Sequence, residues 1–282
     1  MSKLYNVLSK TPNYIKRFGF FRGLLLLGKI EIRKYSQSNV VLKYKIPGYP
    51  APIYLRKSIG DHSIFWQCIV QVQYRFQDFP QSKTLYQHYD QAIQSNNELL
   101  IIDCGANIGL SVVWFAIAFP KATIFAIEPD DENYQLLLKN TQHLGSRVKC
   151  LQGAVWNNAE SVQIMNPDSG SASFQVGEAP DNSSNSVAAY TIDKICELAG
   201  VDSPFIVKID IEGAQKGLFE SHTEWVSKTN LITLELDDWL LPWQGTSRPF
   251  FSCVSQHPFD YLLGGESIFC FQDFTAPPEK AN

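Results

Sequence analysis

The sequence of 282 residues lacks the cysteine and histidine spacings of a zinc site, and it has no long hydrophobic run. None of its six cysteines forms a C-x-x-C pair, and a cysteine with apolar neighbours, such as Cys270, behaves as a small hydrophobe. The apolar stretch 24–27 is far shorter than the roughly 20 residues of a spanning helix, and it lacks a signal-peptide layout. We therefore expect a reducing, cytoplasmic compartment and no transmembrane segment.

A surplus of basic residues is also missing. The chain carries 24 Lys and Arg against 28 Asp and Glu, which gives a net charge of −4. This balance excludes a broad nucleic-acid footprint, so we predict no nucleic-acid partner. Residues 16–22 mix basic and aromatic side chains, which also permits weak peripheral membrane association. Such mixtures more often pack on their own domain, and we favour that interpretation.

The chain changes character near residue 96. Residues 1–95 are rich in Tyr, Gln, Lys and Arg, and several prolines punctuate them. From residue 96 onward, short apolar runs alternate with helical patterns. We predict an N-terminal extension over 1–95 that packs on a core domain over 96–282.

Strands and helices alternate through the predicted core domain. Five apolar runs are typical of buried strands: 98–103, 122–127, 148–155, 205–211 and 231–236. Helical patterns cover 108–119, 131–144, 191–198 and 214–219. Hairpins are expected at 162–165 with 172–176, and at 259–263 with 267–271 across a Gly-Gly turn. The series predicts an α/β fold whose mostly parallel sheet carries helices on both faces.

Ligands of such sheets lie beyond the carboxyl ends of the strands. Directly after the first predicted strand, Asp103 begins a loop in which Gly105 and Gly109 permit tight turns. Glu128 ends the second strand 25 positions later, where nucleotide-binding folds place an acid for the ribose hydroxyls. The alternative is that these glycines and acids are only turn residues.

Two nucleotide motifs are missing from this loop. The dinucleotide pattern G-x-G-x-x-G fails because Asn107 replaces its second glycine, and the P-loop pattern is absent from the chain. The expected ligand is therefore a nucleoside without a pyrophosphate, and S-adenosylmethionine fits that description.

Three motifs give the chain its resemblance to a known family. They are D-C-G-A-N-I-G-L-S at 103–111, A-I-E-P-D-D-E-N at 126–133 and K-I-D-I-E-G-A at 208–214. Upstream, Leu55-Arg56 with Asp61, followed by Phe65-Trp66-Gln67 and Tyr74, is similar to the pattern often seen before that core. The chain resembles the FkbM methyltransferases. The resemblance implies a class I (Rossmann-like) methyltransferase with a seven-stranded sheet, which methylates a hydroxyl of a sugar or polyketide.

The resemblance also implies which residues bind S-adenosylmethionine. The loop after the first strand would line its methionine side, Glu128 its ribose, and residues 153–155 its adenine. The implied cofactor-binding residues are Asp103, Gly105, Ala106, Asn107, Gly109, Ser111, Glu128 and Ala154. One position departs from the family, since Gln215 stands where its pattern has a glutamate.

The fourth predicted strand supplies the catalytic candidates. Lys208, Asp210 and Glu212 alternate onto one face, and three ionisable groups there are costly to bury unless paired or used. We predict that Asp210 accepts the proton of the acceptor hydroxyl. In the alternatives, Lys208 and Asp210 form an ion pair that only orders the loop, or Asp210, Glu212 and Glu235 hold Mg²⁺. His222 is a further candidate base, and we assign no metal site.

The sequence therefore predicts an S-adenosylmethionine-dependent O-methyltransferase that acts on a small-molecule hydroxyl. Two other functions stay open: a nucleotide-dependent oxidoreductase of the NAD type, and a non-catalytic methyltransferase-fold binding module. The aromatic cluster at Trp239, Trp243, Phe250 and Phe251 is expected to be local core more often than a sugar-stacking loop.

Overall fold

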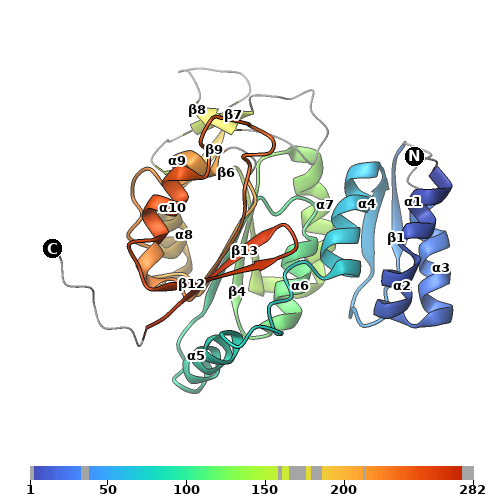
Figure 1. The fold of residues 1–282 in the computed structure, drawn as a ribbon, viewed down its shortest axis with the longest axis horizontal. Coiled ribbons are helices and arrows are strands. Elements are labelled where there is room, and N and C mark those ends of the chain that lie inside the picture. The colour runs from blue at the N-terminus through green and yellow to red at the C-terminus, as the bar shows by residue number, and fades with distance from the viewer. Residues whose placement is uncertain are drawn as a thin grey trace.

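A seven-stranded sheet forms the centre of the computed structural model, which describes residues 3–32, 38–157, 161–164, 176–178, 186–211 and 214–274 (Figure 1). Its strand order is β12-β13-β11-β10-β3-β4-β5. The strands are β3 (Leu100–Cys104), β4 (Thr123–Glu128), β5 (Val148–Gln152), β10 (Ile206–Ile209), β11 (Leu231–Glu235), β12 (Phe259–Gly264) and β13 (Ser267–Gln272). The predicted mostly parallel, seven-stranded α/β sheet is confirmed.

The order of the sheet brings the first and fourth predicted strands side by side. β10 pairs in parallel with β3, and Lys208 lies opposite Asp103 in the register. β3 also pairs in parallel with β4, whereas β13 runs antiparallel to both β11 and β12. From β3, the strands β4 and β5 extend the sheet to one side, and β10 and β11 extend it to the other. The loops after β3 and β10, which carry the predicted site, meet at this switch point.

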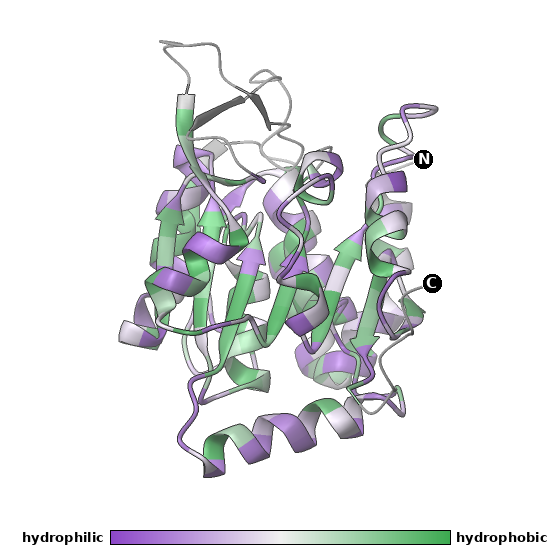
Figure 2. Cartoon of the chain, turned by 90° about the vertical axis from the view of Figure 1, so that its left-hand side faces the viewer, coloured by the Kyte–Doolittle hydropathy of each residue, from purple (hydrophilic) through white to green (hydrophobic). Residues whose placement is uncertain are grey.

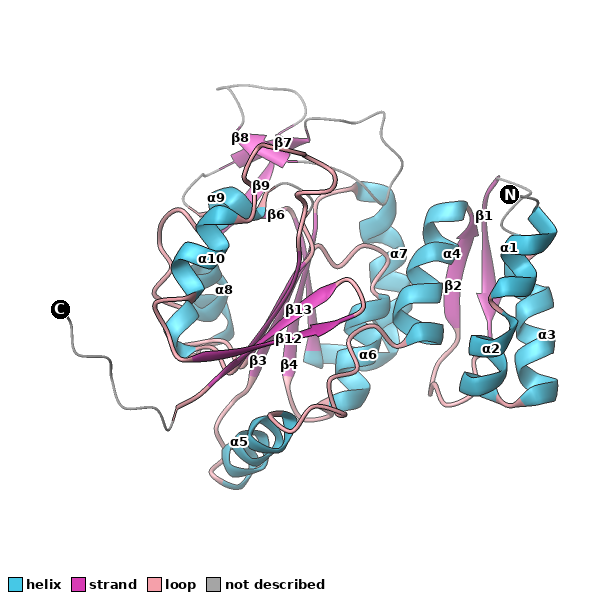
Figure 3. Ribbon diagram, viewed as in Figure 1, coloured by secondary structure: helices cyan, strands magenta, loops and turns pink. Residues whose placement is uncertain are grey.

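Helices cover both faces of this sheet, as predicted (Figure 3). One face carries α6 (Leu110–Ala118) and α7 (Asp131–Thr141), and the other carries α8 (Ile192–Ala199), α9 (Gln215–Leu218) and α10 (Arg248–Val254). Alternate residues of β3 enter two separate cores, with Ile101 on the side of α6 and Ile102 on the side of α8. Because both faces are covered, the central strands are hydrophobic along their length (Figure 2).

Local signals place the ends of α7 and α8. Asp130 accepts a hydrogen bond from the Asn133 amide at the start of α7, and Thr191 does the same for Lys194 at the start of α8. Gly200 ends α8 with φ of +73°. The predicted helix 131–144 is too long, because α7 stops at Thr141 and a 3₁₀ helix, η3 (Gln142–Arg147), follows. A second 3₁₀ helix, η4 (Val226–Lys228), precedes β11.

Residues between β5 and α8 contribute a small second sheet with the strand order β6-β9-β7-β8. Its strands are β6 (Ala154–Val155), β7 (Ser161–Ile164), β8 (Val176–Glu178) and β9 (Ser186–Tyr190). β7 and β8 pair antiparallel, as expected for the hairpin, and the described part of the second strand is Val176–Glu178. The part of that prediction over 172–175 lies outside the described residues.

The N-terminal segment packs against the side of the sheet that carries α6 and α7 (Figure 1). Its elements are α1 (Lys3–Ser9), α2 (Thr11–Phe18), α3 (Phe20–Glu31), β1 (Ser38–Tyr44), β2 (Ile53–Lys57), α4 (Ile59–Phe65), the π-helix η2 (Trp66–Gln71) and α5 (Ser82–Gln94). The Phe76 ring contacts Trp114, Phe119 and Phe269, so this segment shares one hydrophobic core with the sheet.

Within the described ranges, no helix is both long enough and apolar enough to cross a bilayer.

Candidate active site

One cavity of about 710 Å³ opens at the carboxyl ends of β3, β4, β10 and β11. Five of the predicted site residues line it: Gly105, Asn107, Glu128, Ala154 and Asp210. Asp103, Ala106, Gly109, Ser111 and Lys208 do not line it and lie buried or half-buried behind the loop. Glu212 lies outside the described residues.

The glycine loop is shaped by close backbone approach. Gly105 has φ of +79°, and a Cβ atom there would lie 1.9 Å from the carbonyl oxygen of Asp210. No side chain fits such a gap, so the loop and the end of β10 touch only because residue 105 is glycine. Gly109 has φ of +83° and faces Leu137 of α7 in a similar way. The loop is held to β4 because the amides of Gly105 and Ala106 donate to the Ile127 carbonyl.

Glu128 lies at the end of β4 with its carboxyl group against this loop. Its Oε2 accepts the Asn107 amide at 2.8 Å, and its Oε1 accepts the Asp130 amide at 3.1 Å. Burial raises the pKa of Glu128 to about 7, while these backbone hydrogen bonds oppose the rise. A carboxylate held in this way, on the wall of a cavity, is suited to accept hydrogen bonds from a diol.

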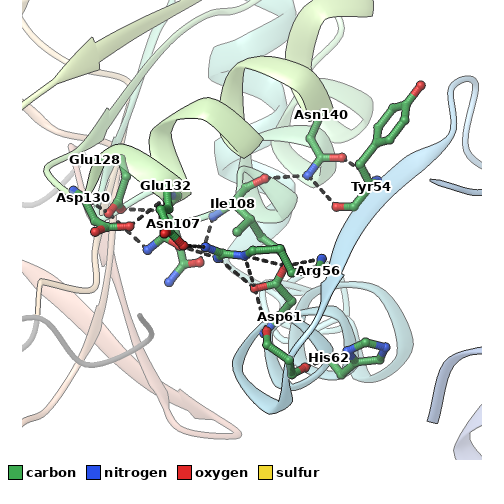
Figure 4. A network of polar contacts seen from close by, with 12 residues as sticks. Tyr54, Arg56, Asp61, His62, Asn107, Ile108, Glu128, Asp130, Glu132 and Asn140 are labelled. Carbon is green, nitrogen blue, oxygen red and sulfur yellow. Dashed lines mark hydrogen bonds and ion pairs between the residues drawn. The ribbon is translucent and has the colours of Figure 1, made fainter. Parts of the chain in front are cut away.

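A buried polar network lies behind Glu128 and begins in the N-terminal segment (Figure 4). Arg56 of β2 pairs with Asp61 at 2.8 Å and donates to the Asn133 side-chain oxygen at 2.5 Å. The Asn133 amide nitrogen then donates to Glu128 Oε1 at 3.4 Å. The Arg56 contact fixes which end of the Asn133 amide faces the glutamate. The sequence motif singled out Arg56 and Asp61, but their connection to Glu128 required the tertiary structure.

Lys208 joins the glycine loop to the end of β10. Its Nζ lies 2.9 Å from Asp103 Oδ1 and 3.4 Å from Asp210 Oδ2, and it donates to the Gly105 carbonyl at 2.7 Å. Burial lowers the pKa of Lys208, but the carboxylates of Asp103 and Asp210 outweigh burial and raise it. Lys208 therefore stays a cation and is not a proton acceptor. On the other side, Ser111 Oγ donates to Asp103 Oδ2 at 2.5 Å.

Asp210 is the member of this ion-pair chain that reaches the cavity, with 30% of its side chain exposed. The ion pair that the sequence offered as an alternative role for Lys208 and Asp210 is present. It holds the carboxylate toward the cavity and leaves it accessible.

The other end of the cavity is formed by segments far from the motifs. Ser63 of α4 and Gln67 of η2 line this end. The other lining residues are Glu235 at the end of β11, Trp239 after that strand, and Glu266 in the β12–β13 turn. The Gln67 side chain donates to Glu266 at 3.2 Å and so bridges the N-terminal segment to the hairpin. Sequence reasoning noted Gln67 only as part of the upstream motif and did not predict Ser63, Gln67 or Glu266 as site residues, because no spacing rule relates them.

Glu235 is the most perturbed carboxyl group at this end. Burial and the nearby Asp210 carboxylate raise the pKa of Glu235 to about 8, although Lys208 and a hydrogen bond from Gln73 oppose the rise. The Glu235 carboxyl group beside Asp210 therefore keeps its proton to a higher pH than an isolated glutamate does. Such a pair offers one hydrogen-bond donor and one acceptor to a hydroxyl group.

The aromatic cluster, which the sequence led us to expect as local core, is mostly exposed. Of the aromatic cluster, only Phe250 is local core, whereas Trp239 is 78% exposed and lines the cavity and Trp243 is fully exposed. His222 is exposed and hydrogen-bonds to Ser221, away from the cavity lining. Within the described ranges, no group of three or more His, Cys, Asp or Glu side chains is arranged to hold a metal ion.

Gln215, the departure from the family pattern, is fully buried at the start of α9. Its Nε2 donates to the backbone carbonyl of Glu235 at 3.0 Å. The glutamine therefore ties α9 to the end of β11, next to the cavity, through a neutral hydrogen bond.

The chain is similar to known methyltransferases. The family model described as the methyltransferase FkbM domain matches residues 103–247. The hexuronic acid methyltransferase AglP of Haloferax volcanii is 24% identical over 143 residues, which cover 51% of this chain and 58% of AglP.

Solved methyltransferase structures are similar at lower identity. A putative caffeoyl-CoA O-methyltransferase from Staphylococcus aureus shares 15% identity with a TM-score of 0.36, over 67% of this chain and 83% of that one. The precorrin-6y C5,15-methyltransferase of Geobacter metallireducens shares 11% identity with a TM-score of 0.36, over 62% and 80% of the two chains.

Proposed function

The chain belongs to the FkbM methyltransferase family, and from this premise we propose that it transfers a methyl group from S-adenosylmethionine to a hydroxyl oxygen of a sugar, polyketide or related small molecule. One observation carries the proposal. A single cavity is bordered by the glycine loop, by Glu128 and by Asp210, at the carboxyl ends of adjacent parallel strands.

The end of the cavity next to the glycine loop and Glu128, which we call the cofactor end, fits S-adenosylmethionine. Glu128 accepts the ribose hydroxyls, the loop at Gly105 and Asn107 borders the methionine part, and Ala154 borders the adenine. The close contact of Gly105 with the Asp210 carbonyl leaves the cavity free of any side chain at that position. When bound, S-adenosylmethionine supplies an activated methyl group on a sulfonium.

Asp210 takes the proton that the acceptor hydroxyl loses. Its carboxylate borders the cavity and Lys208 holds it in place, so it is oriented before the acceptor arrives. The protonated Glu235 beside it donates a hydrogen bond to a neighbouring oxygen of the acceptor. Lys208 and Asp103 are positioning residues, because they act through Asp210 and the loop. Glu212 lies two residues after Asp210 in the same motif, and we propose it as a further catalytic residue.

The opposite end of the cavity, which we call the acceptor end, is acidic, and this limits which methyl acceptors it can bind. Asp210, Glu235 and Glu266 line it, and none of the described lining residues is Lys, Arg or His. Glu235 carries a proton in this proposal, but an acceptor with its own carboxylate next to the reacting hydroxyl would still face the like charge of Asp210. The acidic lining therefore supports an uncharged sugar or polyketide as the methyl acceptor, in contrast to the hexuronic acid in the name of AglP.

The N-terminal segment is part of the same proposal. We regard 1–95 as an extension that packs on a methyltransferase domain at 96–282, and Ser63 and Gln67 give it one wall of the acceptor end. The six cysteines, all within the described residues, are free thiols, which supports a reducing compartment such as the cytoplasm.

Calorimetric titration with S-adenosylhomocysteine tests the cofactor assignment, with NADH as the control ligand. We expect tight binding of S-adenosylhomocysteine, no binding of NADH, and loss of binding in Glu128→Ala. Preference for NADH would instead indicate an oxidoreductase and would reject the proposal.

A radioactive methyl-transfer assay tests the proposed reaction. It measures transfer from S-adenosylmethionine to a panel of neutral glycosides, matched uronides and polyols. Asp210→Asn is expected to lower the rate by roughly 10²–10⁴-fold, with a much smaller change in S-adenosylhomocysteine affinity. An equal loss of both would assign Asp210 to cofactor binding. Tight cofactor binding without transfer to any acceptor would favour a non-catalytic binding module.

A further inference from the structure

The charges of this chain are strongly segregated. Residues 1–60 contain twelve Lys and Arg and a single acidic residue, Glu31, which leaves 12 basic and 27 acidic residues for the other 222. The near-neutral total therefore hides a basic stretch at residues 1–60, which we call the basic segment, beside an acidic remainder of the chain. A segment of this kind is attracted to anionic surfaces, although the whole protein is not.

The one acidic residue of the basic segment, Glu31, does not reduce the charge on its surface. Glu31 is fully buried, and it pairs with Lys10 at 3.0 Å and accepts a hydrogen bond from Tyr14 at 3.0 Å. Lys16 on α2, and Arg22 and Lys29 on α3, are exposed. The basic character of the segment therefore lies on its outer surface.

Helix α3 is hydrophobic on both of its sides. Leu26, Leu27 and Ile30 are buried within the protein, as expected for a helix on a core. The opposite side is hydrophobic as well and exposed, and we call it the α3 outer face: Phe20, Phe21, Leu24, Leu25 and Ile32. Phe21 is 85% exposed and Leu25 is 57% exposed. A helix that is apolar all round is normally covered on all sides.

The place of α3 leaves this face accessible. α3 lies at the edge of the molecule, on the far side of α2 and of the β1–β2 hairpin from the central sheet (Figure 3). Sequence reasoning favoured packing of residues 16–22 on their own domain. Phe18 does so and is buried, but Phe20 and Phe21 point outward, so the expectation was wrong for these two residues.

We propose that the α3 outer face docks on the surface of a lipid bilayer that contains anionic headgroups. Aromatic and aliphatic side chains bordered by Arg22 and Lys29 match such an interface, where apolar groups enter the acyl boundary and cations contact phosphates. A second copy of the chain is a poorer partner. Two outer faces placed against each other would also place their arginine and lysine side chains together. The proposal does not depend on the methyl-transfer reaction.

Co-sedimentation of the full chain with vesicles tests the docking. The vesicles are pure phosphatidylcholine, or phosphatidylcholine with 30% phosphatidylglycerol, at low and high salt. We expect at least tenfold tighter binding to the anionic vesicles, weakened by salt because charge attraction is screened. Phe21→Ser with Leu25→Ser is expected to lower binding by at least tenfold. Arg22→Gln and Lys29→Gln should each lower it by about fivefold.

A matched control is Leu198→Ser on α8, which removes a half-exposed leucine from the acidic remainder of the chain and should leave vesicle binding unchanged. Each variant is checked for S-adenosylhomocysteine affinity and melting temperature, so that unfolding is not mistaken for lost docking. The proposal is overturned by absent or charge-independent vesicle binding, or by full binding of the Phe21→Ser, Leu25→Ser variant. A dimer that forms without lipid and disappears in that variant would assign the face to self-association instead.

Discussion

The two ends of the cavity are built in different ways. The cofactor end comes from one continuous stretch between Gly105 and Val155, in which the lining residues lie at the ends of β3, β4 and β5 or shortly after them. The acceptor end combines α4, η2, the end of β11 and the β12–β13 hairpin, which lie between residues 63 and 268.

Their side chains are also held differently. At the cofactor end, Glu128 is fixed by two backbone amides and a glycine loop that touches β10. At the acceptor end, Trp239 is largely exposed. The carboxyl groups of Glu235 and Glu266 there accept hydrogen bonds from the side chains of Gln73 and Gln67, respectively. The first end is therefore specified by backbone geometry, whereas the second can be changed one side chain at a time. The four predictions below test this difference.

The largest effect is expected from Gly105→Ala. The new Cβ would overlap the Asp210 carbonyl, and residue 105 needs a positive φ, so the loop must move away from β10. We expect S-adenosylhomocysteine affinity to fall by at least about 100-fold, which corresponds to roughly 3 kcal/mol. Calorimetry measures the affinity, and urea unfolding measures the stability.

Gly200→Ala is the matched control for that variant. Gly200 also has a positive φ, but nothing lies within 4 Å of its Cβ position. The Gly200→Ala substitution should lower the free energy of unfolding by only about 1 kcal/mol and leave cofactor affinity unchanged. Wild-type affinity in Gly105→Ala would show that backbone geometry does not define the cofactor end.

The second prediction concerns pH. Because burial raises the pKa of Glu128 to about 7 and only the carboxylate accepts hydrogen bonds at both oxygens, protonation should weaken ribose binding. Affinity for S-adenosylhomocysteine should be constant above pH 8 and fall about tenfold per pH unit below 7. Titrations between pH 5.5 and 8.5 measure this, with Glu128→Gln as the variant whose affinity should be weak at every pH. A flat wild-type profile would remove Glu128 from cofactor binding.

A smaller effect is expected from Asn133→Ala. The Asn133 hydrogen bond lowers the pKa of Glu128, so its loss should move the midpoint of the pH profile upward by less than about one unit. Asn140 provides the control, since it is equally buried on α7 but contacts Tyr54 and Ile108. Asn140→Ala should lower stability without moving the midpoint. If both variants move it equally, the shift reports loosening of α7 and not the hydrogen bond to Glu128.

The smallest effect is expected at the acceptor end. Trp239→Ala should raise KM for the acceptor by about fivefold, because an exposed indole on the cavity wall contributes roughly 1 kcal/mol by stacking. The kcat value and cofactor affinity should not change. Steady-state kinetics of Trp239→Ala and of Trp243→Ala, whose side chain lies outside the cavity lining, measure the difference. An equal effect in both variants would show that Trp239 has no special part in acceptor binding.

Sequence reasoning was most successful where a residue's role follows from its place after a strand. The positions of Gly105, Glu128 and Asp210 at one edge were predictable, because parallel strands end at the same side of the sheet. It failed for contacts between distant segments. Neither the Arg56 connection to Glu128 nor the Gln67 contact with Glu266 follows from any periodicity.

The sequence by itself determined the alternation of strands and helices, the glycine loop and the acid that ends β4, because hydrophobic period and turn chemistry act over a few residues. The tertiary structure decided the rest. It joined the N-terminal segment to the back of Glu128 and placed Lys208 between two carboxylates. It also left one hydrophobic side of α3 exposed. Whether a side chain is buried, paired or exposed depends on which other segments pack against it, and local sequence does not contain that information.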